Sequence, residues 1–133
     1  MAIVLDASIA AAWALADEAS SVAETAAMRL RTEIGWVPSL WWYEIRNLLV
    51  VNERRKRITV DDSEAFLRII AAYPIQVDSV LDERLNLQVA RQYALSFYDA
   101  AYLTVAIRNH APLATLDRDL EVAAATAGVP VLR

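Results

Sequence analysis

The chain of 133 residues contains no cysteine and a single histidine, His110. Without cysteine it has no disulfide, no thiolate metal site and no cysteine nucleophile. One histidine excludes a multi-histidine zinc site and makes a Ser-His triad a poor basis for any activity. Gly35 and Gly128 are the only glycines, too few for a glycine-rich loop that cradles a nucleotide.

Long apolar runs and a positive net charge are also missing. No apolar stretch reaches the length of a membrane span, and the start Met-Ala-Ile-Val-Leu-Asp has no basic leader, so we expect a cytoplasmic protein without a signal peptide or a membrane partner. The net charge of −4 argues weakly against a nucleic-acid binder. Much of the positive charge is local, however, in the consecutive residues Arg54, Arg55, Lys56 and Arg57.

Short apolar segments alternate with helical patterns along the whole chain. This alternation predicts βαβ units and a parallel sheet with helices on its faces. The length and the 57% hydrophobic content suit one globular domain over residues 1–133. We predict strands at residues 3–5, 36–37, 75–77, 113–115 and 129–132. We predict helices at residues 8–16, 22–31, 40–55, 62–72, 82–93, 99–108 and 120–127.

Four acidic residues lie where an α/β protein places its chemistry, and none has an obvious basic partner. They are Asp6, Glu44, Asp99 and Asp117. Asp6 and Asp117 each follow a predicted strand, at the edge where parallel sheets bind ligands. Asp6, Asp99 and Asp117 also have a simpler interpretation, because each lies at a helix start and would serve in a cap. Asp117 is the least secure, since Asp119 would cap the last helix equally well.

Glu44 is the hardest of the four to explain as a surface residue. At 100° per residue it shares a side of its helix with Leu40, Trp41 and Leu48. A carboxylate on an apolar side is costly to bury without a partner. Two carboxylates 4 Å apart repel by roughly 4 kcal/mol at an effective dielectric near 20, so a cluster of them predicts a divalent cation. All-oxygen ligation favours Mg²⁺ or Mn²⁺, which would orient a phosphate and activate water.

The basic run at residues 54–57 has two interpretations. Cations favour helix C-termini, and a run of charge is usually a solvated face. The functional alternative is a clamp that guides a nucleic-acid backbone toward the acids. Trp41 and Trp42 point to different sides of one helix, so Trp42 is a candidate for a dimer or partner surface.

The four acids lie in four short stretches spread over nearly the whole chain. These are Val4-Leu5-Asp6-Ala7-Ser8, Glu44 with Asn47 and Leu48, Ser96-Phe97-Tyr98-Asp99-Ala100-Ala101-Tyr102, and Leu113-Ala114-Thr115-Leu116-Asp117. In their order and spacing they resemble the PIN-domain ribonucleases of the VapC-like toxins from prokaryotic toxin-antitoxin systems. The resemblance implies a PIN-like three-layer α/β/α sandwich with a central, mostly parallel sheet of four to five short strands.

The same resemblance implies a Mg²⁺- or Mn²⁺-dependent endoribonuclease toxin. Its partners would be an RNA substrate, a second copy of the chain in a homodimer, and a cognate antitoxin that neutralises it. The toxin would also form a higher assembly with the antitoxin. The catalytic acids would be Asp6, Glu44, Asp99 and Asp117. The metal ligands among them would be Asp6, Asp99 and Asp117. The supporting polar groups would be Ser8, Asn47 and Thr115.

Three other functions fit parts of the pattern. A receiver-like signalling domain also gathers acids around Mg²⁺, but it needs a lysine after a late strand, and the only lysine is Lys56. An aspartyl-phosphate phosphatase would carry an acid two residues after its nucleophile, where Ser8 follows Asp6. A non-catalytic interaction module, in which the acids only cap helices, would not explain Glu44 on an apolar side.

Overall fold

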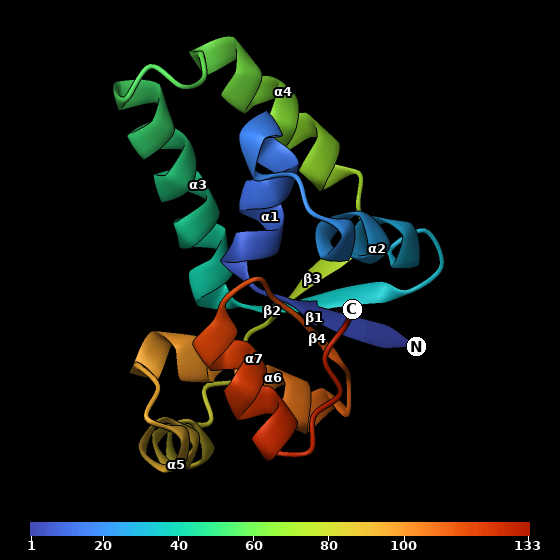
Figure 1. Ribbon diagram of the computed structural model, residues 1–133, viewed down its shortest axis with the longest axis vertical. Helices are drawn as coiled ribbons and strands as arrows, with labels where there is room; N and C mark the ends of the chain where they lie inside the picture. The colour runs from blue at the N-terminus through green and yellow to red at the C-terminus, as the bar shows by residue number, and fades with distance from the viewer.

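A computed structural model describes residues 1–133 as a four-stranded parallel sheet between two layers of helices (Figure 1). The strands are β1 (Ala2–Leu5), β2 (Ile34–Pro38), β3 (Ile75–Asp78) and β4 (Leu113–Ala114). Their order in the sheet is β3-β2-β1-β4, and each neighbouring pair is parallel. The predicted three-layer α/β/α fold is confirmed.

The helices divide between the two faces according to the strands that they connect. The four that lead from β1 through β2 to β3 are α1 (Ala7–Ala14), α2 (Ser21–Arg29), α3 (Ser39–Arg54) and α4 (Val60–Ala71), with a short 3₁₀ turn at Ala16–Glu18. The three around β4 are α5 (Glu83–Tyr93), α6 (Phe97–Asn109) and α7 (Arg118–Thr126). Figure 1 shows the first group on one side of the sheet, with α3 and α4 projecting away from it, and the second group on the other.

The strand order reverses once, between β1 and β4. The chain moves outward from β1 to β2 to β3 over one face, and then returns over the other face to place β4 beside β1. The pairs Val4–Leu113 and Leu5–Ala114 set this register. In open parallel sheets, ligands bind beyond the carboxyl ends of the strands at such a reversal. The fold therefore directs attention to the residues that follow β1 and β4.

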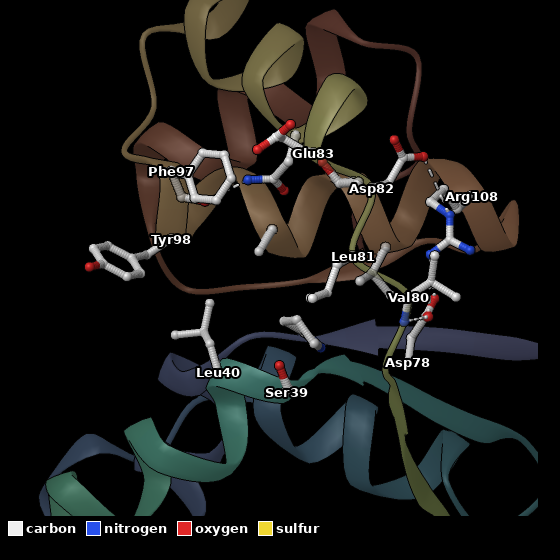
Figure 2. A pocket seen from close by; sticks show the side chains of 15 residues that line it. Ser39, Leu40, Asp78, Val80, Leu81, Asp82, Glu83, Phe97, Tyr98 and Arg108 are labelled. Carbon is white, nitrogen blue, oxygen red and sulfur yellow. Dashed lines mark hydrogen bonds and ion pairs between the residues drawn. The ribbon is translucent and has the colours of Figure 1, made fainter.

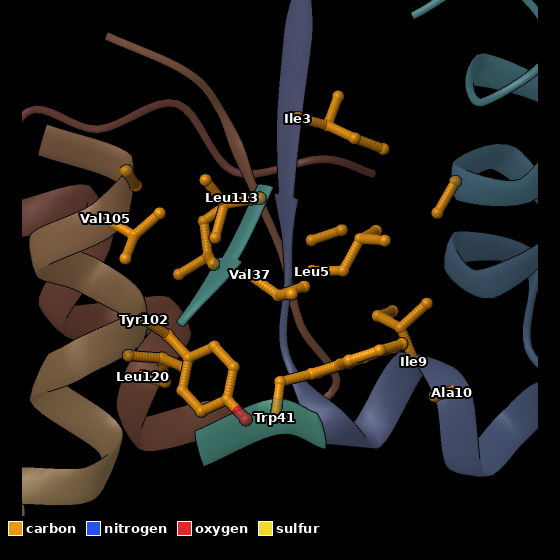
Figure 3. Close-up of a cluster of buried hydrophobic side chains, with 14 of the residues drawn as sticks. Ile3, Leu5, Ile9, Ala10, Val37, Trp41, Tyr102, Val105, Leu113 and Leu120 are labelled. Atoms are coloured by element: carbon orange, nitrogen blue, oxygen red, sulfur yellow. The ribbon is translucent and has the colours of Figure 1, made fainter. Parts of the chain in front are cut away.

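The core lies on both faces of β1, which is why that strand is continuously apolar. Ile3, Val4 and Leu5 are fully buried, as parallel strands covered on both faces must be. Figure 3 shows Tyr102 of α6 on one side of β1 and Ile9 of α1 on the other. Helix α6 is buried over most of its circumference and contacts β1, β2 and β4. Such a central helix holds its first turn at a defined place relative to the strand ends.

The predicted fifth strand at residues 129–132 is wrong. Only Val131 forms a single parallel bridge, to Leu113. Pro130 has no N–H to donate to a ladder, and β4 is only two residues long, so little strand is available to pair with. The other predicted strands and helices are all present, with ends displaced by one or two residues. None of the helices combines the length and the apolar character that crossing a bilayer requires.

Candidate active site

Asp6 lies at the carboxyl end of β1, and its carboxylate connects three segments of the chain. Asp6 is only 5% exposed. Its Oδ1 accepts the backbone N–H groups of Ser8 at 3.1 Å and Ile9 at 3.4 Å and the Ser8 hydroxyl, so Asp6 is the N-cap of α1. Its Oδ2 accepts the hydroxyl of Thr115, the residue after β4. The carboxylate therefore bridges β1 and β4 at the reversal in strand order.

Ser8 and Thr115 hold this carboxylate from two sides. The Ser8 hydroxyl donates to Asp6 and accepts the backbone N–H of Leu116 at 2.8 Å. The Thr115 hydroxyl donates to Asp6 and accepts the backbone N–H of Asp117 at 2.9 Å. Both hydroxyls thus connect Asp6 to the segment that leads into α7, and they restrict the orientation of its carboxylate.

Glu44 lies in the second turn of α3 and is partly buried. Its Oε1 accepts the hydroxyl of Tyr102 at 2.9 Å. Tyr102 is buried on α6, three residues after Asp99, so the contact joins a helix from each layer. Tyr102 was not singled out as a site residue from the sequence. The signal that would have identified it is its position on the same side of α6 as Asp99.

Asp99 and Asp117 lie at the first turns of α6 and α7. Ser96 caps α6 by accepting the Asp99 backbone N–H at 3.0 Å, and the Asp99 carboxylate makes no return bond to the Ser96 backbone. The predicted role of Asp99 in the cap is therefore not seen, because Ser96 alone caps α6, and the Asp99 side chain is partly buried. Asp117 is exposed and caps α7, accepting the backbone N–H of Leu120 at 3.1 Å.

The carboxylates influence one another through space. Burial is the largest cause that raises the pKa of Asp6, of Glu44 and of Asp99. The negative charges of Asp99 and Asp6 raise the pKa of Glu44 further, and those of Asp117 and Asp119 raise the pKa of Asp99. No cation is among the groups that act on these three carboxyls. The five acids therefore form one electrostatically coupled cluster, called the acidic cluster below.

The side chains of the acidic cluster do not form a complete metal-binding site. No three of its side chains converge closely enough to ligate one ion. The expected carboxylate pocket is thus looser than the sequence predicted. The available donors are nevertheless all oxygen, and buried carboxyls with raised pKa and no cationic neighbour favour a cation. This chemistry fits a hard divalent ion such as Mg²⁺ or Mn²⁺.

The remaining predicted residues of α3 and its C-terminal end are Asn47 and the basic run. Asn47 is exposed and makes no side-chain hydrogen bond within the chain. The basic run lies at the far end of α3, and a rise of 1.5 Å per residue puts Arg54 about 15 Å along the axis from Glu44. Arg57 is held by Asp17 at 2.7 Å. The structure therefore does not bring residues 54–57 to the acidic cluster.

Fold and site together define an α/β domain with acidic groups at the carboxyl edge of a parallel sheet. A family model described as the PIN domain matches residues 3–125, so the chain belongs to the PIN-domain family. PIN domains are nucleases. The PIN-domain resemblance is therefore confirmed, and the receiver-like alternative is wrong.

Two solved structures have similar folds. One is PAE2754 from Pyrobaculum aerophilum, with a TM-score of 0.69 and 28% identity over 92% of this chain and 79% of that chain. The other is VapC20 from Mycobacterium tuberculosis, described as a sarcin-ricin loop cleaving toxin, with a TM-score of 0.60 and 19% identity over 91% of this chain and 94% of that chain. At 19% identity the second likeness shows the fold alone. No functionally curated protein matches this chain.

Proposed function

We propose that this chain is a metal-dependent endoribonuclease that acts in the cytoplasm as the toxin of a toxin-antitoxin system. The observation that carries the proposal is the buried Asp6 carboxylate, bonded to Thr115 where the strand order reverses and coupled to Glu44. Membership of a nuclease family supports the reaction class. The fold shared with VapC20, described as a sarcin-ricin loop cleaving toxin, supports the toxin role.

The acidic cluster would hold the metal through Asp6, Asp99 and Asp117. A bound Mg²⁺ or Mn²⁺ would polarise the scissile phosphate and promote ionisation of a water. Ser8 and Thr115 orient the Asp6 carboxylate and so fix one side of this site. The carboxylates supply no positive charge of their own, so an RNA phosphate would be repelled from the cluster without a cation.

Glu44 would act as the proton acceptor. Burial raises its pKa, and a carboxyl that titrates closer to neutral pH is a better base at the pH of the cell. The attacking water would form a bond to phosphorus and lose a proton to Glu44. The bond from phosphorus to the leaving ribose oxygen would break, and that oxygen would take a proton from solvent. The Tyr102 hydroxyl holds the Glu44 carboxylate in one orientation for this step.

The proposal is tested by cleavage of total RNA with the wild type and with Asp6→Asn and Asp99→Asn. Each substitution keeps the side-chain size but removes a ligand charge, so we expect cleavage to fall by at least about 100-fold. EDTA should abolish wild-type cleavage and Mg²⁺ or Mn²⁺ should restore it. Asp61→Asn, at an exposed acid on α4, is the matched control and should cut like the wild type. Full cleavage by both site variants would refute the assignment.

We further infer that the chain forms a homodimer and is neutralised by a cognate antitoxin. An exposed aromatic pair on α3 supports a partner surface, because Trp42 and Tyr43 lie 5.1 Å apart in an edge-to-face contact on the outside of that helix. Sedimentation velocity of the purified chain measures the dimer. Co-expression with the product of an adjacent reading frame, followed by a cleavage assay of the complex, measures neutralisation.

A further inference from the structure

A pocket of about 380 Å³ lies beside the acidic cluster, between the start of α3, the β3–α5 loop, α5 and α6 (Figure 2). None of the four predicted catalytic acids lines it. Two of its lining residues are nevertheless close to them in the chain: Tyr98 directly precedes Asp99, and Leu40 comes one helical turn before Glu44. The pocket is therefore a second site next to the proposed centre.

The walls of this pocket are mostly apolar and aromatic, although they lie at the surface. Figure 2 shows Phe97 and Tyr98 on one side, Val80 and Leu81 on the other, and Leu40 below. Leu81 is 88% exposed and Tyr98 is 69% exposed. Exposed aromatic rings around a hollow of this size match a planar aromatic ligand, and unpaired nucleobases bind proteins by stacking on such rings.

Thr104 and Glu83 are polar residues of the pocket whose side chains have no partner in the chain. Thr104 lines the pocket and is 4% exposed, and its Oγ1 makes no hydrogen bond, although nearly all buried hydroxyls do. A rotation about the χ1 angle of Thr104 exchanges the positions of its methyl and hydroxyl groups. Glu83, at the first position of α5, takes part in no ion pair or side-chain hydrogen bond. A free carboxylate offers only acceptors and therefore selects a ligand with donors.

The charges around the pocket disfavour a phosphate. Its acids are Asp78, Asp82 and Glu83, and its single cation, Arg108, is already paired with Asp78 at 3.1 Å and lies 3.8 Å from Asp82. A neutral ring with adjacent N–H donors is the ligand that fits. Guanine presents N1–H and N2–H₂ side by side, a spacing that matches the two oxygens of one carboxylate.

We propose that this pocket binds one unpaired guanine base of the RNA, next to the phosphate held at the acidic cluster. Phe97 and Tyr98 stack on the base, Glu83 accepts its N1–H and N2–H₂ groups, and the Thr104 hydroxyl bonds to its remaining edge. The idea rests on the proposed ribonuclease function. It also explains how a chain with a net charge of −4 holds RNA, namely through a base rather than through many phosphates.

The test uses the full chain and the four neutral nucleosides, without metal, followed by amide chemical shifts in NMR titrations. Guanosine should shift the amides of residues 81–83, 97–99 and 104, and adenosine, cytidine and uridine should bind at least about tenfold more weakly. Tyr98→Ala and Glu83→Gln should each weaken guanosine binding by about tenfold. Thr104→Val, which keeps the shape, should weaken it by about fivefold.

Matched controls exist for both main variants. Met28 on α2 is 66% exposed, close to the 69% of Tyr98, and does not line the pocket, so Met28→Ala should leave guanosine binding unchanged. Glu64→Gln, at an exposed acid on α4, is the control for Glu83→Gln. Wild-type-like circular dichroism of each variant shows that it folds.

Two results would overturn the assignment: equal binding of all four nucleosides, or no guanosine binding. The second could occur together with a Tyr98→Ala variant that dissociates a dimer. That combination would assign the pocket to a second copy of the chain. Nucleosides contain no phosphodiester, so their binding is measured independently of cleavage. A chain that binds guanosine but cuts no RNA would refute the ribonuclease function and would not contradict guanine binding in the pocket.

Discussion

Two acids of the cluster have a local structural role as well as a proposed chemical one. Asp6 caps α1 and Asp117 caps α7, so the interpretation of these two residues as helix caps is correct. Asp6 does more than a cap requires, because its second oxygen accepts the Thr115 hydroxyl from another strand end. Glu44 caps nothing, and its burial beside other carboxylates opposes folding at neutral pH. It is therefore the residue whose presence most needs a functional reason.

At neutral pH, Glu44→Gln should stabilise the folded chain while it abolishes activity. Burial raises the pKa of Glu44, so the folded chain binds its proton more tightly than the unfolded chain, and wild-type stability falls as pH rises through that range. Removing the charge should raise the free energy of unfolding at pH 7 by roughly 0.5–2 kcal/mol, a gain common when a functional group is removed.

The gain in stability of Glu44→Gln should vanish at a pH below the ordinary pKa of glutamate, where the wild-type side chain is neutral in both the folded and the unfolded chain. Urea unfolding at the two pH values measures the difference. The matched control Glu64→Gln removes an exposed charge and should show little change at either pH. A Glu44→Gln variant less stable than the wild type at pH 7 would contradict this prediction and show that the hydrogen bond from Tyr102 outweighs the cost of burying the charge.

Among the secondary structure elements, α3 and α6 decide the geometry of the site. One lies in each helical layer, and each has an acid near its first turns: Glu44 on α3 and Asp99 on α6. The hydrogen bond from Tyr102 to Glu44 is the side-chain link between them at the site. Because α6 is buried and packs on three strands, it is the rigid element that positions the carboxylate carried by α3.

Tyr102→Phe should loosen this link with little change in packing. The lost hydrogen bond should cost about 0.5–1.5 kcal/mol of stability. The Tyr102 hydroxyl lowers the pKa of Glu44, so without it that pKa rises further and the acid limb of the pH–rate profile should move to higher pH. Tyr93→Phe on α5 is the control. A pH–rate profile that does not move would mean that Glu44 is not the titrating base.

At the scale of the whole molecule, the basic run and the acidic cluster lie far apart. The two lie at opposite ends of α3, and Figure 1 shows that this helix projects away from the sheet. Arg57 pairs with Asp17 and with Glu18 at 3.5 Å, which ties the end of α3 to the segment after α1. Arg54, Arg55 and Lys56 are exposed and remain available for an RNA backbone.

If the basic run binds RNA, replacing Arg54, Arg55 and Lys56 by Ala should weaken binding and flatten its salt dependence, by about one unit of slope for each lost phosphate contact. Fluorescence anisotropy of labelled RNA in EDTA at several salt concentrations measures the slope. Arg57→Ala is the internal control, because it should lower stability more than it changes the slope. Unchanged binding by the triple variant would remove the run from the site and leave the guanine pocket as the main contact.

The sequence by itself determined the secondary structure elements, the parallel α/β class and the positions of the acids along the chain. These depend on local patterns: apolar runs such as Ile3 to Leu5, helical periodicity, and caps that join near neighbours. The false strand at 129–132 shows the limit of such patterns, because an apolar run forms a strand only where another strand can pair with it.

Only the tertiary structure decided how the acids are held. The bonds from Thr115 to Asp6 and from Tyr102 to Glu44 join residues 109 and 58 positions apart. It also decided that the acidic cluster is open, that the basic run lies at the far end of α3, and that an aromatic pocket opens beside Asp99. The physical reason is that contacts between distant segments depend on how whole elements pack, and local periodicity carries no information about that packing.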